Sequence, residues 1–504
     1  MNRAAKISLK VLKVFGWILL AVFILLFVVV LFIRSPWGQE VIVDKAVTYV
    51  QDKTQTKVAI DRLFITFSGN VYLEGVYLED QQADTLLYSQ ALETGVDFLP
   101  LIKDGAIHIS KLDWKGVKAN VSRDSVTQKF NFDFIMEALA SGADSVAAEP
   151  VEAATSSSLP DIDLGPIRMQ NFDLSYVDEV MGLEGKFQLG QLNLHMERLD
   201  LNKMDFYIKD FLFDNSSIYY KQTKAFEPAV EDTIAAGPMP LVIIDRLAIN
   251  NVKAYYESQP DGILADVSLG DFLVELPQAN LETNKVVLKT LNLNNSEVLL
   301  KMAQQVEIQD STDVTGDTVA APGFAWPDWE VDVQQVSFDQ NRIVYQSGEE
   351  NPQIGYFNPN AVELQNLSLQ INNVFLRENQ AKLNLNRFSF EETSGFALQE
   401  FKLGLAITNN NTQLSGLSLI TNRSQLAGDA TVGYASLEEL MSFPERSKVD
   451  LGLQLEADLR DAYFFSPDLA RDTVLSKAAQ HPVLADLEVD GSLELLTISG
   501  VDIQ

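Results

Sequence analysis

The chain has 504 residues, a formal net charge of −32, an apolar content of 46% and no cysteine. So much apolar sequence can bury a core, which excludes a disordered chain, and the lack of cysteine excludes disulfides, thiolate metal sites and cysteine nucleophiles. The strong negative charge argues against nucleic acid or anionic headgroups as ligands along the surface.

The first 34 residues differ from the rest because they contain five Arg or Lys and no Asp or Glu. Residues 14–33 are uncharged, and at about 1.5 Å per residue a helix over them would cross a hydrocarbon core of roughly 30 Å. The positive-inside rule then predicts a cytoplasmic tail (1–13), a transmembrane anchor (14–33) and a bulk on the far side of the membrane. A cleaved signal peptide fits less well, because its apolar core has about 7–15 residues.

A helix is predicted over residues 35–52. Ser35 is a favourable N-cap and the proline after it suits the first helical position. Val43, Val47 and Val50 recur at helical spacing and give one apolar stripe. The stripe fits simple core packing, or a plug that covers the membrane-proximal end of the β region, and the sequence leaves both open.

From Thr56 onward apolar residues recur at every second position, which is typical of strands with one buried face. The clearest runs are "KLNLNRFSF" (382–390) and "DLGLQLEADL" (450–459). Amphipathic helices are few after the first one. The best candidates are residues 132–140, 435–441 and 468–480.

One pattern recurs along the chain, and "IIDRLAINNVKAYYES" (243–258) shows it best. Ile244, Leu247 and Ile249 are followed by Asn251, which we interpret as a turn residue. Further copies begin at Ile109, Leu164, Ile208, Leu288 and Val333. Recurrence at this spacing predicts a repeat architecture of strand–turn–strand units that bury their apolar faces by stacking on neighbours. The alternative is chance alternation in a β-rich chain.

These signals divide the body into an N-terminal β segment (56–140), a flexible linker rich in Ser, Ala and acidic residues (141–160), and a repetitive β region (161–504). A second polar stretch, at 309–323, resembles the linker in composition. The last residues enter another copy of the pattern at Ile498, so we expect the protein to continue beyond residue 504.

Catalytic motifs are missing from the sequence. His108, His195 and His481 are far apart and form no metal-binding pair. The sequence contains no phosphate-binding loop, no nucleophile elbow and no EF-hand spacing. We therefore expect no enzyme activity, no cofactor and no metal.

Four stretches resemble the N-terminal region of the TamB and AsmA-like family of Gram-negative envelope proteins. They are "SPWGQ" (35–39), "LEDQQADTLLYS" (78–89), "LIKDGAIHISKLDWKGVKANVSRD" (101–124) and "FNFDFI" (130–135). The resemblance covers about the first 135 residues. It implies an inner-membrane anchor, a periplasmic bulk, and a long curled sheet (a β-taco) with an apolar groove that moves phospholipid towards the outer membrane. It also implies an Omp85-type outer-membrane barrel as a partner, and no catalytic residues.

The predicted fold is therefore mainly β, with a single N-terminal transmembrane helix, a long curled repetitive sheet with an apolar groove, and few short helices. The alternating runs give the residues expected to line that groove and touch phospholipid: Leu383, Leu385, Leu451, Leu453 and Leu455. The alternative is a membrane-tethered scaffold of closed β-sandwiches that assists outer-membrane protein translocation and assembly with the Omp85-type barrel. An enzyme is the third and weakest hypothesis.

Overall fold

The computed structural model describes residues 32, 35–66, 68–96, 107–140, 162–226, 238–303, 325–492 and 495–503. The chain divides into two compact units: unit 1 comprises Met1–Val180 with Phe187–Leu189, and unit 2 comprises Met181–Lys186 with Gly190–Gln504. The predicted tail, the predicted anchor apart from Phe32, the linker (141–160) and the polar stretch (309–323) lie outside the described residues. No helix within the described ranges is both long and apolar enough to cross a membrane.

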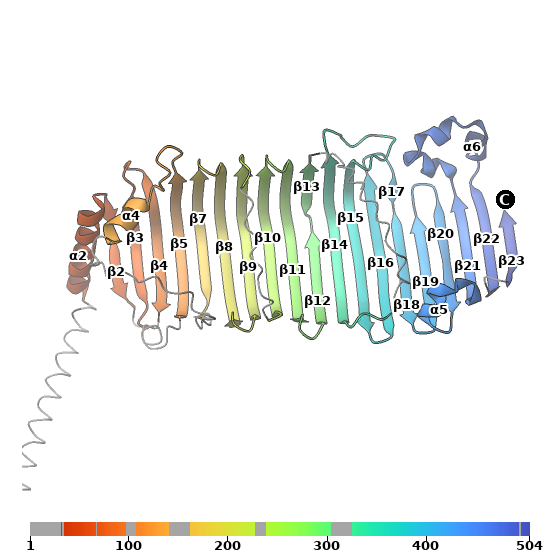
Figure 1. Ribbon diagram of the computed structural model, residues 1–504, viewed down its shortest axis with the longest axis horizontal. Coiled ribbons are helices and arrows are strands. Elements are labelled where there is room, and N and C mark those ends of the chain that lie inside the picture. The colour runs from red at the N-terminus through yellow and green to blue at the C-terminus, as the bar shows by residue number, and fades with distance from the viewer. Residues whose placement is uncertain are drawn as a thin grey trace, which may run out of the picture. The chain divides into compact units, whose positions relative to one another are not determined.

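Both units are built mainly from strands, which account for 63% of the structure against 13% for helices. This confirms the mainly β class. The strands of unit 1 are β1 (Val58–Ala59), β2 (Arg62–Ile65), β3 (Val71–Glu79), β4 (Thr85–Val96), β5 (Ile107–Arg123), β6 (Ile162–Leu164) and β7 (Ile167–Asp178) (Figure 1). β1 and β2 both pair antiparallel with β3, and β3, β4 and β5 form a meander. β6 and β7 run parallel to β5, because the chain crosses over between them.

Two helices accompany the sheet of unit 1, α2 (Pro36–Thr54) and α4 (Asp133–Ala140). Ser35 caps α2, accepting a hydrogen bond from the amide of Gly38 at 3.0 Å. The helix packs against β1, β2 and α4. Val43, Val47 and Val50 lie on this helix and are all half-buried, as the apolar stripe predicts.

Unit 2 contains a longer series of strands (Figure 1). They are β8 (Leu183–Asp200), β9 (Asp205–Gln222), β10 (Leu241–Ser258), β11 (Ile263–Asn280), β12 (Lys285–Asn294), β13 (Glu297–Met302), β14 (Glu330–Ser347), β15 (Ala361–Arg377), β16 (Gln380–Glu392), β17 (Ala397–Leu398), β18 (Glu400–Thr408), β19 (Asn411–Ile420), β20 (Gln425–Gly433), β21 (Lys448–Ala457), β22 (Val483–Ser492) and β23 (Leu495–Ile503). β8 has three of its residues in unit 1.

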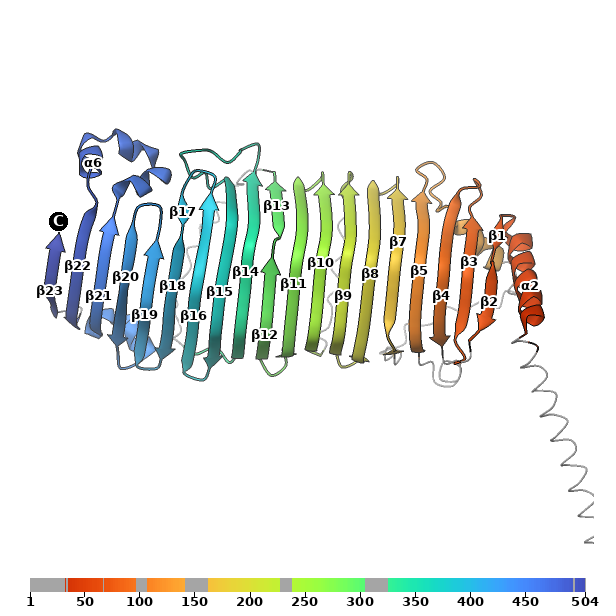
Figure 2. The same ribbon diagram turned by 180° about the vertical axis from the view of Figure 1, so that it is seen from behind.

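The pairing in unit 2 mixes directions. β10 is parallel to β9, and β14 is parallel to β12 and β13. From β14 to β23 successive strands form an antiparallel meander, in which β16 pairs with both β17 and β18 (Figure 2). Each parallel step follows a crossover connection, which parallel pairing requires.

The short helical segments of unit 2 are α5 (Leu437–Ser442), α6 (Thr473–Ala478), η1 (Pro444–Arg446), η2 (Leu459–Phe464) and η3 (Pro467–Arg471). The predicted helix over 468–480 is therefore divided into η3 and α6. The division falls at Asp472, whose carboxylate caps α6 by accepting from the amides of Val474 and Leu475 at 2.7 and 3.0 Å.

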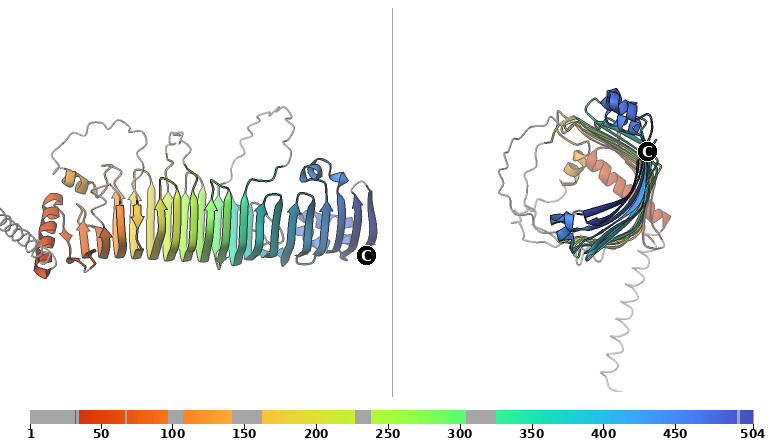
Figure 3. Two further views of the ribbon diagram at one scale, coloured as in Figure 1. Left: turned by 90° about the horizontal axis from the view of Figure 1, so that it is seen from below. Right: turned by 90° about the vertical axis from the view of Figure 1, so that its right-hand side faces the viewer.

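The asparagine of the recurring pattern was wrongly predicted to be a turn between strands. β10 continues through Asn251, which has a left-handed φ of 52°. Its neighbours on both sides stay paired with β9, Asn250 opposite Asp214 and Val252 opposite Ser216. A single left-handed residue, which asparagine tolerates, thus redirects the strand without reversing it. Viewed end-on, the strands of unit 2 bend along their length (Figure 3, right).

The recurrence itself has a structural explanation in the parallel pairs. Leu247 lies opposite Phe211 and Ile249 opposite Phe213, so two copies of the pattern are aligned position for position. The copies on β12 and β14 are aligned in the same way, and so are those on β5 and β7 in unit 1. Parallel strands in register place equivalent residues side by side, so each copy supplies the apolar neighbour that the previous copy requires.

Candidate functional site: an uncovered apolar face in unit 2

Apolar side chains of unit 2 are aligned from strand to strand in columns of directly paired residues. Before the left-handed asparagine, two columns run from β9 to β15: Phe211–Leu247–Val274–Leu291–Val336–Ile371 and Phe213–Ile249–Phe272–Leu293–Phe338–Leu369. Directly paired residues share one face of a sheet. These columns therefore form a continuous apolar band across six neighbouring strands.

The band continues beyond the asparagine, but on β10 its apolar residues then occupy even-numbered positions in place of odd-numbered ones. On β10 the apolar residues are Leu247 and Ile249 before Asn251, and Val252, Ala254 and Tyr256 after it. A left-handed residue within a strand re-aims the side chains after it, so the apolar set stays on one face. Two further columns result: Ile218–Ala254–Val267–Val298–Ile343–Leu364 and Tyr220–Tyr256–Ala265–Leu300–Tyr345–Val362. We call the face formed by these four columns the apolar face.

The five predicted leucines belong to this face. Leu385 on β16 pairs with Ile371 and so extends the first column. Leu383 is connected to Leu451 on β21 through a chain of cross-strand partners: Leu405, Leu414 and Ala430. Leu453 and Leu455 share a face with Leu451, because alternate residues of a strand point the same way.

All five predicted leucines are half-buried, and along β21 they alternate with exposed residues. Whether they touch lipid stays a prediction.

The apolar face is not covered by a second layer within the described part of unit 2. Its described strands pair side by side, and no other described strand lies across them as in a sandwich (Figures 1 and 3). Large apolar side chains consequently stay exposed: Ile218 by 41%, Tyr256 by 38% and Ile343 by 39%. Two of the most completely buried side chains are instead small and polar, Ser258 and Ser296.

The opposite face of the same strands is charged. Lys221 pairs with Glu257 at 3.3 Å, and Lys289 pairs with Glu275 at 3.1 Å. Hydrogen bonds from Gln259 and Tyr255, with Lys221 nearby, lower the pKa of Glu257. This face therefore stays ionised and hydrated at neutral pH, which gives the sheet one wet and one apolar side.

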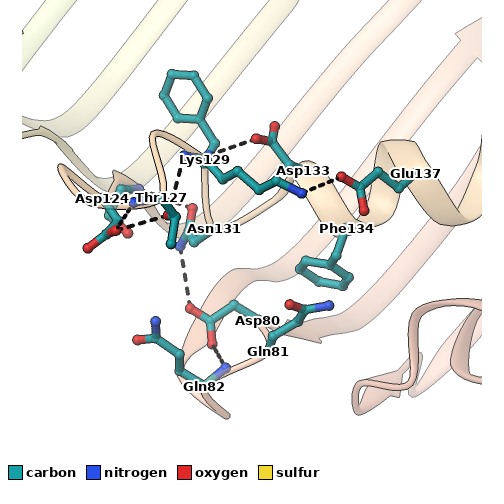
Figure 4. A pocket seen from close by; sticks show the side chains of 12 residues that line it. Asp80, Gln81, Gln82, Asp124, Thr127, Lys129, Asn131, Asp133, Phe134 and Glu137 are labelled. Carbon is teal, nitrogen blue, oxygen red and sulfur yellow. Dashed lines mark hydrogen bonds and ion pairs between the residues drawn. The ribbon is translucent and has the colours of Figure 1, made fainter. Parts of the chain in front are cut away.

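A cavity of about 360 Å³ in unit 1 is the other candidate (Figure 4). It lies between the β3–β4 turn, the end of β5 and α4, and its lining includes Asp80, Asp124, Asp133 and Glu137. Each carboxylate already has a structural partner. Asp80 accepts from the amides of the β3–β4 turn at 2.9 Å, Asp133 accepts from the amide of Phe130 at 2.8 Å, and the other two bind local groups.

These contacts hold turns and the start of α4 in place, so we assign the cavity a structural role. Across the described ranges no cluster of three His, Cys, Asp or Glu residues could hold a metal ion. His108 has Asp163 3.9 Å away, on the neighbouring parallel strand.

The columns beyond the asparagine were not predicted from the sequence. The signal that could have found them is the change of phase in "LAINNVKAYY", where apolar residues move from odd to even positions across Asn251. Reading the asparagine as a turn concealed that signal.

Comparison with known proteins gives no relative for this chain: no family model, no curated protein and no solved structure matches it.

Proposed function

We propose that the apolar face of unit 2 carries the acyl chains of phospholipids. The observation that supports this is the set of unbroken apolar columns on a face that no second layer covers within the described strands. An exposed apolar surface of this extent in a folded protein marks an interaction site. A surface made of such columns, which hold no charged side chain, suits a hydrocarbon chain better than a polar ligand.

The energetics favour such a role. Exposing an acyl chain to water costs about 0.8 kcal/mol per CH₂, or roughly 12 kcal/mol for sixteen carbons. A continuous apolar surface lowers that barrier at every step, because a chain that moves from one strand to the next exchanges one apolar contact for another. No energy source is needed at the site itself.

The sequence features suggest where this happens. With the predicted anchor at 14–33, the resemblance to TamB and AsmA-like proteins supports an inner-membrane-anchored periplasmic bridge that moves phospholipid towards the outer membrane, with an Omp85-type barrel as partner. The scaffold of closed sandwiches is less well supported, because the described strands of unit 2 form a single layer.

Leu453 provides the test. A photocrosslinking residue at position 453 of the full chain in cells should capture phospholipid. The matched control is the neighbouring position 454, because Gln454 is exposed and points to the opposite face. Capture at 454 but not at 453, with folded protein abundant, would contradict the proposal.

A substitution at the same position tests transport. Leu453→Asp should reduce phospholipid supply to the outer membrane at unchanged protein level, because desolvating the carboxylate costs several kcal/mol, and water that enters to hydrate it interrupts the apolar surface equally. Gln454→Asp should have little effect. Equal supply in both variants and the wild type would refute the transport role of this row.

A further inference from the structure

Three tyrosines occupy the last of the four apolar columns. Tyr220 and Tyr256 are neighbours on parallel strands, and their rings stack at 5.3 Å with an interplanar angle of 3°. Tyr345 on β14 lies in the same column, connected through Ala265 and Leu300. We call Tyr220, Tyr256 and Tyr345 the tyrosine column.

The tyrosine column marks a boundary in polarity. The preceding column holds Ile218 and Ala254, whereas the residues two positions further along the strands are Gln222 and Ser258, which are polar and buried. The rings thus extend the apolar surface to its edge, and the hydroxyl of Tyr220 reaches the polar Gln222 beyond it. Tyrosine is suited to such a boundary, because one end of its side chain is apolar and the other forms hydrogen bonds.

The hydroxyl of Tyr220 has an acceptor that a ligand can replace. It donates to Oε1 of Gln222 over a long 3.4 Å. Burial raises the pKa of Tyr220, and Tyr256 and Asp261 add to the rise, so the hydroxyl keeps its proton at neutral pH. It remains a donor and offers no charge to the ligand.

Two cations near this level face the other way. Lys221 lies on the opposite face, paired with Glu257. Arg342 also lies on that face, with Glu363 at 2.9 Å and Glu297 at 3.7 Å. These cations are engaged by carboxylates and are not directed to a phosphate on the apolar face.

We propose that the tyrosine column donates hydrogen bonds to the ester carbonyls of a glycerolipid whose acyl chains lie on the apolar face. The inference rests on the proposed function and adds to it that the ester region is recognised and the headgroup stays in water. Binding then depends on the ester linkage and little on the charge of the headgroup.

The experiment compares lipids with and without ester carbonyls. The full chain is held in amphipol, and binding of a fluorescent diacyl phosphatidylethanolamine is measured against its ether-linked analogue. Wild type should bind the ester lipid more tightly. The triple variant Tyr220→Phe, Tyr256→Phe and Tyr345→Phe should bind it about 2- to 10-fold more weakly, as expected for lost hydrogen bonds, with ether-lipid binding unchanged.

A second pair of stacked tyrosines is the matched control. Tyr219 and Tyr255 stack at 5.2 Å on the same two strands but on the charged face. The double variant Tyr219→Phe and Tyr255→Phe should bind both lipids as the wild type does. Equal loss in the control, equal loss of both lipids in the triple variant, or equal wild-type affinity for both lipids would overturn the inference. If the wild type binds neither lipid, the proposed function fails as well.

Discussion

Gly270 provides a direct test of the bend in unit 2, because a side chain has no space at its position on β11. A Cβ atom there would lie 2.5 Å from the carbonyl oxygen of Asn295 and 2.7 Å from that of Asn294. Both are backbone atoms, so a flexible side chain cannot move aside to relieve the clash. The amide of Gly270 also donates to Oγ of Ser296 at 3.1 Å, and the clash would lengthen this hydrogen bond.

We expect Gly270→Ala to lower the free energy of unfolding by about 1–3 kcal/mol, the usual cost of overpacking. The entropic advantage of alanine in the unfolded chain offsets at most about 1 kcal/mol of this. Gly452→Ala on β21 is the matched control, because nothing lies within 4 Å of its Cβ position. It should leave stability unchanged or raise it slightly.

Denaturant unfolding of the full chain, followed by circular dichroism, measures the difference, and amide exchange on β11 and β21 locates it. The same close approach occurs at Gly190, where a Cβ would lie 2.5 Å from the carbonyl oxygen of Asn215. Gly190→Ala should therefore behave like Gly270→Ala. Equal midpoints for Gly270→Ala, Gly452→Ala and the wild type would refute the close packing at the bend.

Two further predictions concern local stability. Asn295 has a φ of 51°, which disfavours a β-branched residue and suits glycine. Asn295→Val should therefore lower the free energy of unfolding by about 1–2 kcal/mol, whereas Asn295→Gly should not. Equal denaturant midpoints for the two variants would contradict this. The pKa of Glu93 is lowered, chiefly because Lys111 and then Asn70 donate hydrogen bonds to its carboxylate. The ionised carboxylate therefore stabilises the folded protein at neutral pH, and this contribution is lost as the pH falls through the folded-state pKa. Thermal melts should show Glu93→Gln destabilising at neutral pH, with the difference from wild type disappearing in acid; a constant difference would exclude the ionised form as the cause.

The β class and the position of the apolar residues could be predicted because they depend on local alternation. A period of two indicates a strand with one buried face whatever the strand pairs with. Leu451, Leu453 and Leu455 were selected on this basis, and they do lie on one half-buried face of β21. Their connection to Leu383 through three intervening strands depends on register, which no local pattern contains.

A curled sheet was expected, but the position of the bend at the asparagines could not be predicted, because turns and left-handed positions within strands favour the same residues. Asparagine is common in both. What distinguishes them is whether the flanking segments pair with each other or with other strands. At Asn251 both flanks pair with β9 and β11, so the strand is redirected and does not reverse. The parallel direction of β9 and β10 was also missed, because the crossover between them carries no signal in the pattern.

The buried positions of unit 2 include small polar side chains as well as apolar ones. At the bend the buried positions include Ser216 and Ser296, whose hydroxyls accept from the amides of Gly190 and Gly270 at 3.2 and 3.1 Å. Val252, the direct partner of Ser216, and Leu367 are also buried at this position, so the bend accepts both small polar and apolar side chains. Some large apolar side chains away from the bend, such as Ile218 and Ile343, remain partly exposed.

A sheet that bent less could close its apolar face against a second layer and gain the free energy of that burial. Unit 2 forgoes this gain along its described strands, and its stability rests on strand pairing and on contacts between neighbouring columns. Such a face is a liability in water unless something apolar occupies it. A passing acyl chain would supply the missing contacts one strand at a time, so the feature that weakens the isolated sheet is the one that a lipid conduit requires.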